Sequence, residues 1–134
     1  MILALDYGER YIGIAAADPP DTPVHRYGTI DQETGNVMSH LQSIVQREGV
    51  KKILVGIPAG LSGNETEQTH KNLAFVERLR EALGPGISVE GVDETLTSAE
   101  ADRVLRTEGG DMSDQHAEAA RLMLVNYLAQ NLNN

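Results

Sequence analysis

Residues 52–57 (KILVGI) are apolar at every position after the first lysine. An unbroken apolar run, in place of an alternation of apolar and polar residues, is typical of a strand that is buried on both faces of its sheet. Such a strand needs helices on both sides, so this segment predicts an α/β fold. The chain has 134 residues, which suits one compact domain and is too short for two. We therefore expect a single domain over residues 1–134.

Four further strands are expected along the chain. They are predicted over residues 2–5, 11–17, 24–30 and 87–92. The first two would form a hairpin through the turn at residues 8–10. With the segment at 52–57, these strands predict a mixed five-stranded sheet.

Helices are expected between the later strands and at the end of the chain. Apolar residues at helical spacing predict helices near residues 37–45 and 75–83. A capping box formed by Thr97 and Glu100 predicts a third helix, to about residue 106. The last helix is expected to have Ser113 as its N-cap. This order of elements predicts helices on both faces of the sheet.

Composition excludes several classes of site. The chain contains no cysteine, which removes disulfides, zinc–thiolate sites and thiol nucleophiles. It shows neither the features of a signal peptide nor an apolar run of about 18 residues that could cross a membrane. These features predict a cytoplasmic protein. The net charge of −9 opposes binding to nucleic acid, so such a function would depend on a local basic patch and on bound cations.

Acidic residues follow two of the predicted strands. Asp6 comes after the first strand, and Glu94, preceded by Asp93, comes after the strand at 87–92. In open α/β sheets functional groups collect at the carboxyl ends of the strands, where the loop at residues 58–64 is also expected. Two carboxylates brought together there repel each other unless a cation lies between them. Mg²⁺ or Mn²⁺ bound in this way is the arrangement that phosphodiester hydrolysis uses.

Each of these acidic residues also has a purely structural interpretation. Asp6 is a residue type that caps tight turns, and here it would cap the backbone of Gly8. Asp93 and Glu94 would be a solvated acidic pair at a helix N-terminus, where negative charge is favoured. The ion-binding hypothesis is supported by the two acidic segments together, because neither is specific alone.

Four segments carry a family resemblance. They are LALDYGERYIGIAAADP, VGIPAGLSGNETEQ, VDETLTSAEA and AARLMLVNYL, and in this order they cover nearly the whole chain. The chain resembles the YqgF (RuvX) family, bacterial proteins with a ribonuclease-H-like fold that are related to Holliday-junction resolvases. The resemblance implies a metal-dependent nuclease that processes the 5′ end of precursor 16S ribosomal RNA, with the ribosome precursor as its partner. It also implies, as an alternative, a nuclease for branched DNA such as Holliday junctions.

The resemblance also implies which residues form the acidic site. The family has an Asp after the first strand, a Glu in an Asp-Glu-Arg motif and an Asp at the start of the last helix. Carried over, these positions are Asp6, Glu94 and His116. The hypothesis is that His116 replaces the third carboxylate as a metal ligand. The site would then bind Mg²⁺ or Mn²⁺, with Mn²⁺ favoured because imidazole suits softer ions.

The sequence departs from the family at further positions. Thr95 stands where the family has Arg, and the segment before the last helix is acidic and glycine-rich. Asp111 and Asp114 are alternative third carboxylates. Helical spacing places Asp114 on one face with Glu118, away from the inward stripe, whereas His116 is expected on the inward face and in the first turn. The helix dipole would keep the imidazole neutral in that turn.

Basic residues near the predicted site are candidates for contacts to nucleic acid. Arg10 adjoins the site, and Lys71 and Arg78 lie seven positions apart on one face of the second helix. No tryptophan and a single phenylalanine leave no stacking platform for single strands.

Three functions follow from these observations. The first is a two-metal phosphodiesterase acting on RNA, and also on branched DNA. The second is a nucleic-acid-binding module with a degenerate site, which the departures at His116 and Thr95 favour. The third is a nucleotide-binding fragment of the actin and sugar-kinase type, but the chain is too short for the second lobe of those proteins. No heptad or apolar stripe demands an oligomer, so a monomer or a weak homodimer is expected.

Overall fold

The computed structural model describes residues 1–19, 21–58, 67–93 and 112–132, and in the last of these ranges it describes the side chains of residues 115–130. The elements in chain order are β1 (Ile2–Tyr7), β2 (Tyr11–Asp18), β3 (Thr22–Asp31), α1 (Val37–Glu48), β4 (Lys52–Ile57), α2 (Glu67–Leu83), β5 (Ser88–Asp93) and α4 (Met112–Leu132). None of the described helices is long and apolar enough to cross a membrane.

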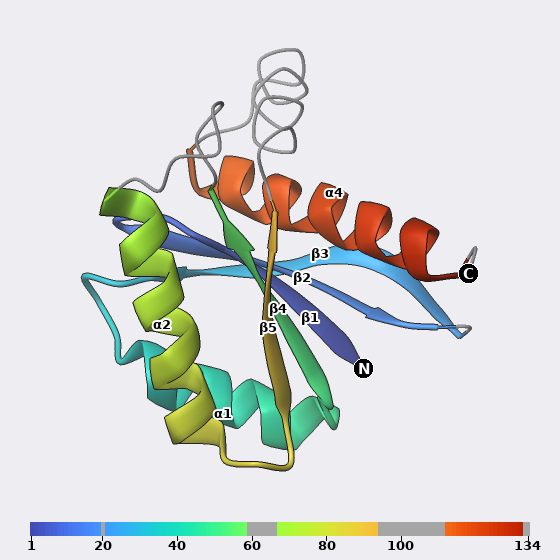
Figure 1. Cartoon of the computed structure of the whole chain (residues 1–134), viewed down its shortest axis with the longest axis horizontal. Helices are drawn as coiled ribbons and strands as arrows, with labels where there is room; N and C mark the ends of the chain where they lie inside the picture. The colour runs from blue at the N-terminus through green and yellow to red at the C-terminus, as the bar shows by residue number, and fades with distance from the viewer. Residues whose placement is uncertain (20, 59–66, 94–111, 133–134) are drawn as a thin grey trace.

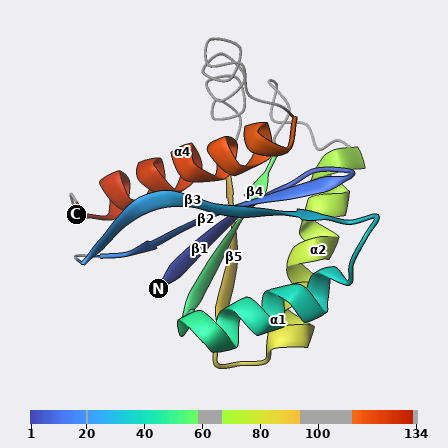
Figure 2. The same cartoon turned by 180° about the vertical axis from the view of Figure 1, so that it is seen from behind.

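The strands form one five-stranded sheet in the order β3-β2-β1-β4-β5. The first three strands pair antiparallel, while β1 with β4 and β4 with β5 pair parallel. Helices α1 and α2 cover one face of the sheet and α4 crosses the other, as the two opposite views in Figures 1 and 2 show. The predicted mixed five-stranded sheet with helices on both faces is therefore confirmed.

Alternation along β1 divides its side chains between the two faces. Leu3 and Leu5 pack into the core beneath α1 and α2, whereas Ala4 packs beneath α4. Asp6 lies two residues beyond Ala4, so it shares the face that α4 covers. The sheet thus carries a carboxylate on the face that a single helix crosses.

Helix α4 packs with its backbone directly against Gly13 of β2. A Cβ atom placed on Gly13 would lie 2.0 Å from the carbonyl carbon of His116 and 2.2 Å from the backbone nitrogen of Ala117. Any side chain at this position would collide with the helix backbone. The absence of a side chain at Gly13 therefore determines how close α4 comes to the sheet.

Two predicted boundaries differ from the structure in ways that matter for the site. Strand β1 continues to Tyr7, so Asp6 lies inside the strand, opposite Gly13 of β2. Pairing with β2 extends the strand past the apolar run that suggested its end.

Helix α4 begins at Met112, so Ser113 is inside the helix and not its N-cap. His116 consequently lies in the second turn, beyond the turn in which the helix dipole acts most strongly. The helix predicted from Thr97 lies outside the described residues.

Candidate functional site

A buried carboxylate lies near the C-terminal end of β1. Asp6 is only 7% exposed, and a buried carboxylate without a partner is costly. Its partner is His116 of α4, whose Nδ1 lies 2.7 Å from Oδ2 of Asp6. An ionised carboxylate can only accept hydrogen bonds, so with Asp6 ionised the donor in this pair would be Nδ1. Two residues 110 positions apart in the sequence thus meet at one end of the sheet.

Glycines on two sides make room for His116. Gly13 admits the helix backbone at His116, and Gly8, in the turn after β1, borders the imidazole ring. A Cβ atom placed on Gly8 would lie 2.6 Å from Cε1 and 2.8 Å from Nε2 of His116. The ring edge opposite Asp6 is therefore packed against the turn.

The turn that borders the imidazole is held by hydrogen bonds from the end of β3. Gln32 donates from Nε2 to the carbonyl oxygens of Gly8 (2.7 Å) and Glu9 (3.2 Å). The backbone nitrogen of Gln32 donates to the carbonyl oxygen of Arg10 at 2.8 Å. The position of Gly8 against His116 thus depends on a residue that the sequence did not suggest, because its role comes from strand pairing.

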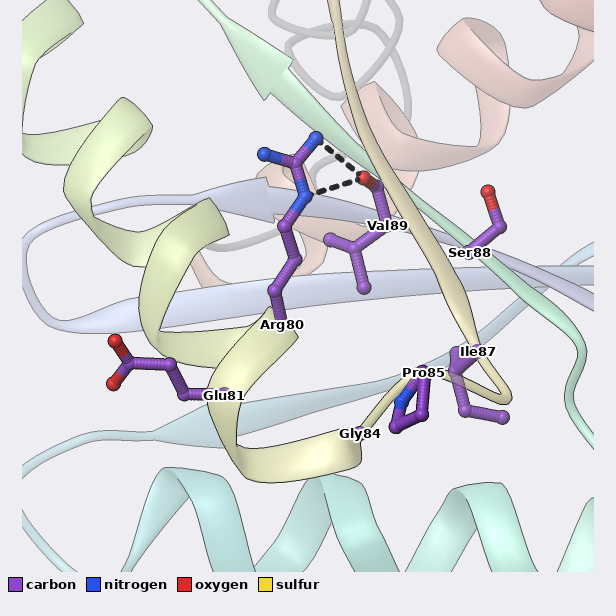
Figure 3. Close-up of a pocket in the computed structure, with 7 residues that line it drawn as sticks. All are labelled: Arg80, Glu81, Gly84, Pro85, Ile87, Ser88 and Val89. Carbon is purple, nitrogen blue, oxygen red and sulfur yellow. Dashed lines mark hydrogen bonds between the residues drawn. The ribbon is translucent and has the colours of Figure 1, made fainter.

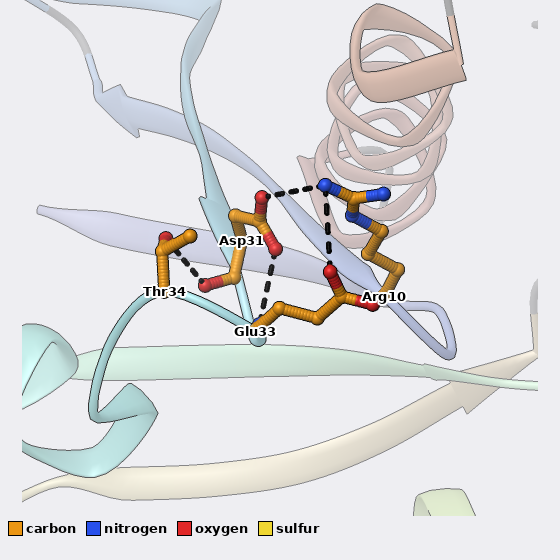
Figure 4. A network of polar contacts seen from close by, with 4 residues as sticks. All are labelled: Arg10, Asp31, Glu33 and Thr34. Atoms are coloured by element: carbon orange, nitrogen blue, oxygen red, sulfur yellow. Dashed lines mark hydrogen bonds and ion pairs between the residues drawn. The ribbon is translucent and has the colours of Figure 1, made fainter.

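Arg10, a predicted contact to nucleic acid, lies in an acidic network (Figure 4). Its Nη2 lies 3.3 Å from Oδ2 of Asp31 and 3.5 Å from Oε2 of Glu33. The hydrogen bond to Asp31 raises the pKa of Arg10. The pKa of Asp31 is lowered by the backbone N–H of Glu33 and by Arg10. Two carboxylates therefore face this one guanidinium group, which weakens its attraction for phosphate.

The other two predicted nucleic-acid contacts differ from each other. Lys71 lies 3.8 Å from Glu67 within α2. Arg78 lies over the ring of Phe75, 5.6 Å from its centroid, and Phe75 stacks on Tyr7 with ring centroids 4.4 Å apart. Among the described residues no carboxylate lies within 4.0 Å of Arg78. The guanidinium group of Arg78, on the helix next to the end of β1, is thus not neutralised by a carboxylate of the described residues.

Glu94, Thr95 and Asp111 lie outside the described residues, as does the side chain of Asp114. Strand β5 ends at Asp93, which pairs with Ile57 at the C-terminal end of β4. Because β1, β4 and β5 are parallel, β5 ends at the same end of the sheet as β1, as Figure 1 shows. The prediction that Glu94 joins Asp6 stays a prediction.

The described part of the chain contains no cluster of three or more His, Asp or Glu side chains arranged to hold a metal ion. It does bring together one carboxylate and one imidazole, Asp6 and His116. Mg²⁺ is commonly bound by one or two carboxylates, with water filling its other positions. The Asp6 carboxylate is therefore a type of ligand that a hard divalent ion accepts.

Polar side chains of α2 hold the C-terminal end of β4, a feature that the sequence did not reveal. Asn72 is fully buried and donates from Nδ2 to the carbonyl oxygen of Gly56 at 2.7 Å. Thr69 donates from Oγ1 to the carbonyl oxygen of Pro58 at 2.5 Å. These bonds satisfy carbonyl groups where β4 leaves the sheet, and they attach the start of α2 to the same end as Asp6.

The burial of Glu118 differs from the prediction, although Ala117, Ala120 and Leu124 of the expected inward stripe are buried as predicted. Glu118 was expected on a face turned away from the inward stripe, but it is 1% exposed. Its Oε1 accepts from Nε of Arg26 on β3 at 2.9 Å and from Nε of Arg121 at 2.6 Å. The hydrogen bond from Arg121 is the largest cause that lowers the pKa of Glu118. Strand β3 also packs along α4, so the buried face of the helix is wider than its apolar stripe.

A separate hollow of about 620 Å³ lies between the end of α2 and the start of β5 (Figure 3). Arg80 lines it and donates from Nε (3.1 Å) and Nη2 (2.8 Å) to the carbonyl oxygen of Val89. Its polar lining is completed by Glu81 and Ser88, and it lies at the opposite end of α2 from Thr69. This hollow lies beside the start of the edge strand β5 and is remote from the Asp6–His116 pair.

Comparison with known proteins adds a family to this geometry. Residues 1–130 match the family described as RuvX, Holliday junction resolvase. A protein of Syntrophus aciditrophicus (strain SB), named "Putative pre-16S rRNA nuclease", is 36% identical over 132 residues, covering 95% of this chain and 87% of the relative. A protein of the same name from Dictyoglomus thermophilum is 33% identical over 134 residues, covering 95% and 94%.

Two solved structures share the fold. The RuvC structure from Thermus thermophilus superposes with a TM-score of 0.56 at 13% identity, covering 97% of this chain and 96% of RuvC. RuvC from T. thermophilus in complex with a Holliday junction substrate gives 0.55 at 12% identity, covering 96% and 94%. At these identities the likeness shows the fold alone, and it confirms the expected ribonuclease-H-like fold.

Proposed function

The chain belongs to the family described as RuvX, Holliday junction resolvase, and from this premise we propose that it is a metal-dependent nuclease. The natural substrate in this proposal is the 5′ end of precursor 16S ribosomal RNA, processed in the cytoplasm on the ribosome precursor. The names of the relatives support RNA as the substrate. The RuvC complex with a Holliday junction supports branched DNA as the second candidate.

The observation that carries this proposal is the buried Asp6 carboxylate with His116 at 2.7 Å. Asp6 lies at the end of the sheet where functional groups of α/β folds collect, on a face reached by the start of α4. In the proposed site Asp6 and Glu94 hold the metal ions, and His116 is the third side chain of the site, next to Asp6. The ions would supply an activated water nucleophile and would stabilise the leaving oxygen.

The residues of the chain have defined tasks in this reaction. Asp6 presents its carboxylate in a fixed direction, because the strand and His116 both hold it. The rigid turn at Gly8 borders the imidazole. Mg²⁺ or Mn²⁺ would suit this site, and a preference for Mn²⁺ is expected only if His116 is itself a ligand.

Electrostatics also favour dependence on metal ions. Eleven Lys and Arg residues include Arg103 and Arg106, which lie outside the described residues, leaving nine. Within the part of the chain that the structure describes, seven of these nine lie within 4.0 Å of a carboxylate, and Lys51 and Arg78 do not. Affinity for phosphates from the described surface is therefore limited, so bound cations would provide part of the attraction. Arg78 is the side chain that we propose to contact the nucleic-acid backbone.

The proposal is tested by cleavage of labelled precursor RNA and of branched DNA with Mg²⁺, Mn²⁺ or chelator. We expect cleavage of RNA that needs metal and is abolished by Asp6→Asn. The matched control is Asp31→Asn, which removes a carboxylate from the Arg10 network and should leave cleavage intact. Binding of RNA without cleavage under any of these conditions would contradict a nuclease and support the degenerate binding module.

A further inference from the structure

We propose that His116 is a positioning residue that orients Asp6, and that it is not itself a ligand of the metal ion. This inference rests on the proposed metal site and assigns the role of one residue within it. It differs from the replacement of a third carboxylate that the sequence suggested. The difference can be measured, because a nitrogen ligand and a hydrogen-bond donor leave different spectroscopic signatures.

The hydrogen bond determines which ring nitrogen faces the carboxylate. Nδ1 of His116 lies 2.7 Å from Oδ2 of Asp6. In this proposal Nδ1 carries the hydrogen, which then occupies the lone-pair direction that a metal ion would need. An imidazole binds a metal through a nitrogen without hydrogen. Ligation through Nδ1 would therefore require this bond to break, and Asp6 would lose its described partner.

The second ring nitrogen is directed away from the carboxylate. Nε2 and Cε1 form the edge that packs against Gly8, where an added Cβ would be 2.8 Å and 2.6 Å away. Nδ1 is the ring nitrogen that faces the Asp6 carboxylate, whereas Nε2 lies on the side of the ring next to Gly8. Rotation of the ring is opposed by Gly8, whose carbonyl oxygen is held by Gln32 at 2.7 Å.

The helix backbone is equally constrained. Gly13 lies directly beneath the peptide that joins His116 to Ala117, at distances that exclude a side chain. Two residues further along α4, buried Glu118 is bonded to Arg26 of β3 at 2.9 Å. The imidazole therefore has little freedom to approach or leave Asp6. Such a donor to a carboxylate ligand fixes the orientation of the ligand and raises metal affinity through it.

The hydrogen bond is tested first in the metal-free protein. Long-range ¹H–¹⁵N correlation spectra of ¹⁵N-histidine-labelled protein identify which ring nitrogen of each histidine carries hydrogen. We expect Nδ1 of His116 to be protonated and its proton to be protected from exchange with water, and we expect Asp6→Ala to remove that protection. A hydrogen on Nε2 alone would overturn the proposal without any reference to metal.

Metal ligation is tested with Mn²⁺ by pulsed electron paramagnetic resonance, which detects directly coordinated ¹⁴N. Three variants separate the roles. His116→Asn keeps an N–H donor near Nδ1, His116→Leu keeps bulk without a donor, and His40→Asn is the matched control on the exposed surface of α1. We expect no coordinated ¹⁴N in the wild type. We expect Mn²⁺ affinity within about twofold for His116→Asn and His40→Asn, and about tenfold or more weaker for His116→Leu.

Each outcome has one meaning. A coordinated ¹⁴N signal in the wild type that disappears in His116→Asn would overturn the positioning role and leave the metal-dependent nuclease standing. Equal loss of affinity in His116→Asn and His116→Leu would also overturn it. Failure of the wild type to bind Mn²⁺ would instead contradict the metal site of the proposed function, while the spectra of the metal-free protein would still decide the hydrogen bond. If His116→Leu does not fold, the ¹⁴N signal and His116→Asn remain decisive.

Discussion

The two faces of the sheet bury different kinds of side chain. The face beneath α1 and α2 is filled by large apolar residues, among them Leu3, Leu5, Ile14, Ile53, Phe75 and Leu79. The face beneath α4 combines Leu54, Met123 and Leu124 with the small residues Ala4, Ala15, Ala17 and Ala120. Gly13 continues this face toward the site, and there the backbone of α4 leaves no room for a side chain.

This difference between the two faces suggests that one face mainly stabilises the fold and the other mainly positions the site. Large side chains bury the most apolar surface, so the α1–α2 face contributes most of the hydrophobic stabilisation. Small side chains let a helix approach closely, and a close helix places His116 against Asp6. The expected effects of mutations therefore differ between the faces in kind as well as in size.

The largest loss of stability is expected on the α1–α2 face. Leu79 is fully buried on α2, and Leu79→Ala should lower the free energy of unfolding by about 2–5 kcal/mol, measured by urea denaturation. The matched control is Leu73→Ala on the same helix, where the side chain is 41% exposed and the change should be within about 0.5 kcal/mol. The Nδ1–H signal of His116 should survive in folded Leu79→Ala. Its disappearance would show that the two faces are not independent.

The next effect is smaller in stability but destroys the site. Gly13→Ala places a methyl group on the backbone of α4, and we expect a loss of about 3 kcal/mol together with loss of the His116 Nδ1–H signal and of Mn²⁺ binding. Gly28→Ala is the control, since a Cβ there would meet nothing within 4 Å. Gly13→Ala with an unchanged His116 signal would refute the role of close approach.

A substitution of Glu118 tests how much its ion pairs on α4 contribute to the free energy of unfolding. Glu118→Gln removes the charge that Arg26 and Arg121 neutralise, and it should cost about 1–2 kcal/mol at pH 7, because both arginines are partly exposed. The folded-state pKa of Glu118 is lowered, so its contribution is complete above its ordinary value of 4.5 and is lost as the pH falls below it. Urea denaturation of both proteins should therefore show a difference that shrinks from pH 7 toward pH 3. A constant difference would contradict this assignment.

The smallest change in stability is expected at the turn after β1, which contains Gly8 and borders His116. Gln32→Ala removes two hydrogen bonds to the turn and should cost about 1 kcal/mol in urea denaturation. Gln42→Ala is the matched control, because Gln42 donates to the carbonyl oxygen of Ala82 on the α1–α2 side. Isothermal titration should show weaker Mn²⁺ binding for Gln32→Ala and unchanged binding for Gln42→Ala. Equal Mn²⁺ affinities would remove the turn from the account of the site.

The fold was largely predictable because its signals are local. The unbroken apolar run of β4 and the hairpin turn after β1 follow from neighbouring residues, and the mixed sheet follows from their order. Boundaries were less predictable, since Asp6 and Tyr7 join β1 through pairing with β2. Sequence spacing cannot reveal how far pairing continues.

Only part of the expected site can be compared with the structure, because Glu94 lies outside the described residues and the roles of Asp6 and His116 stay predictions. Asp6 and His116 were expected together from the family resemblance, and the structure places them 2.7 Å apart. The direction of the imidazole depends on Gly8, Gly13 and Gln32, whose roles arise only when three strands and a helix meet. Burial of Glu118 was missed for the same reason, because a helical period does not show where β3 packs.

The most direct test of the central claim is a crystal structure with Mn²⁺, located by its anomalous scattering. We expect a peak about 2.1 Å from a carboxylate oxygen of Asp6, with Nδ1 of His116 still hydrogen-bonded to that carboxylate and no peak in Asp6→Asn crystals. A Mn²⁺ ion bound by the His116 ring, or an ion site that survives Asp6→Asn, would contradict the account.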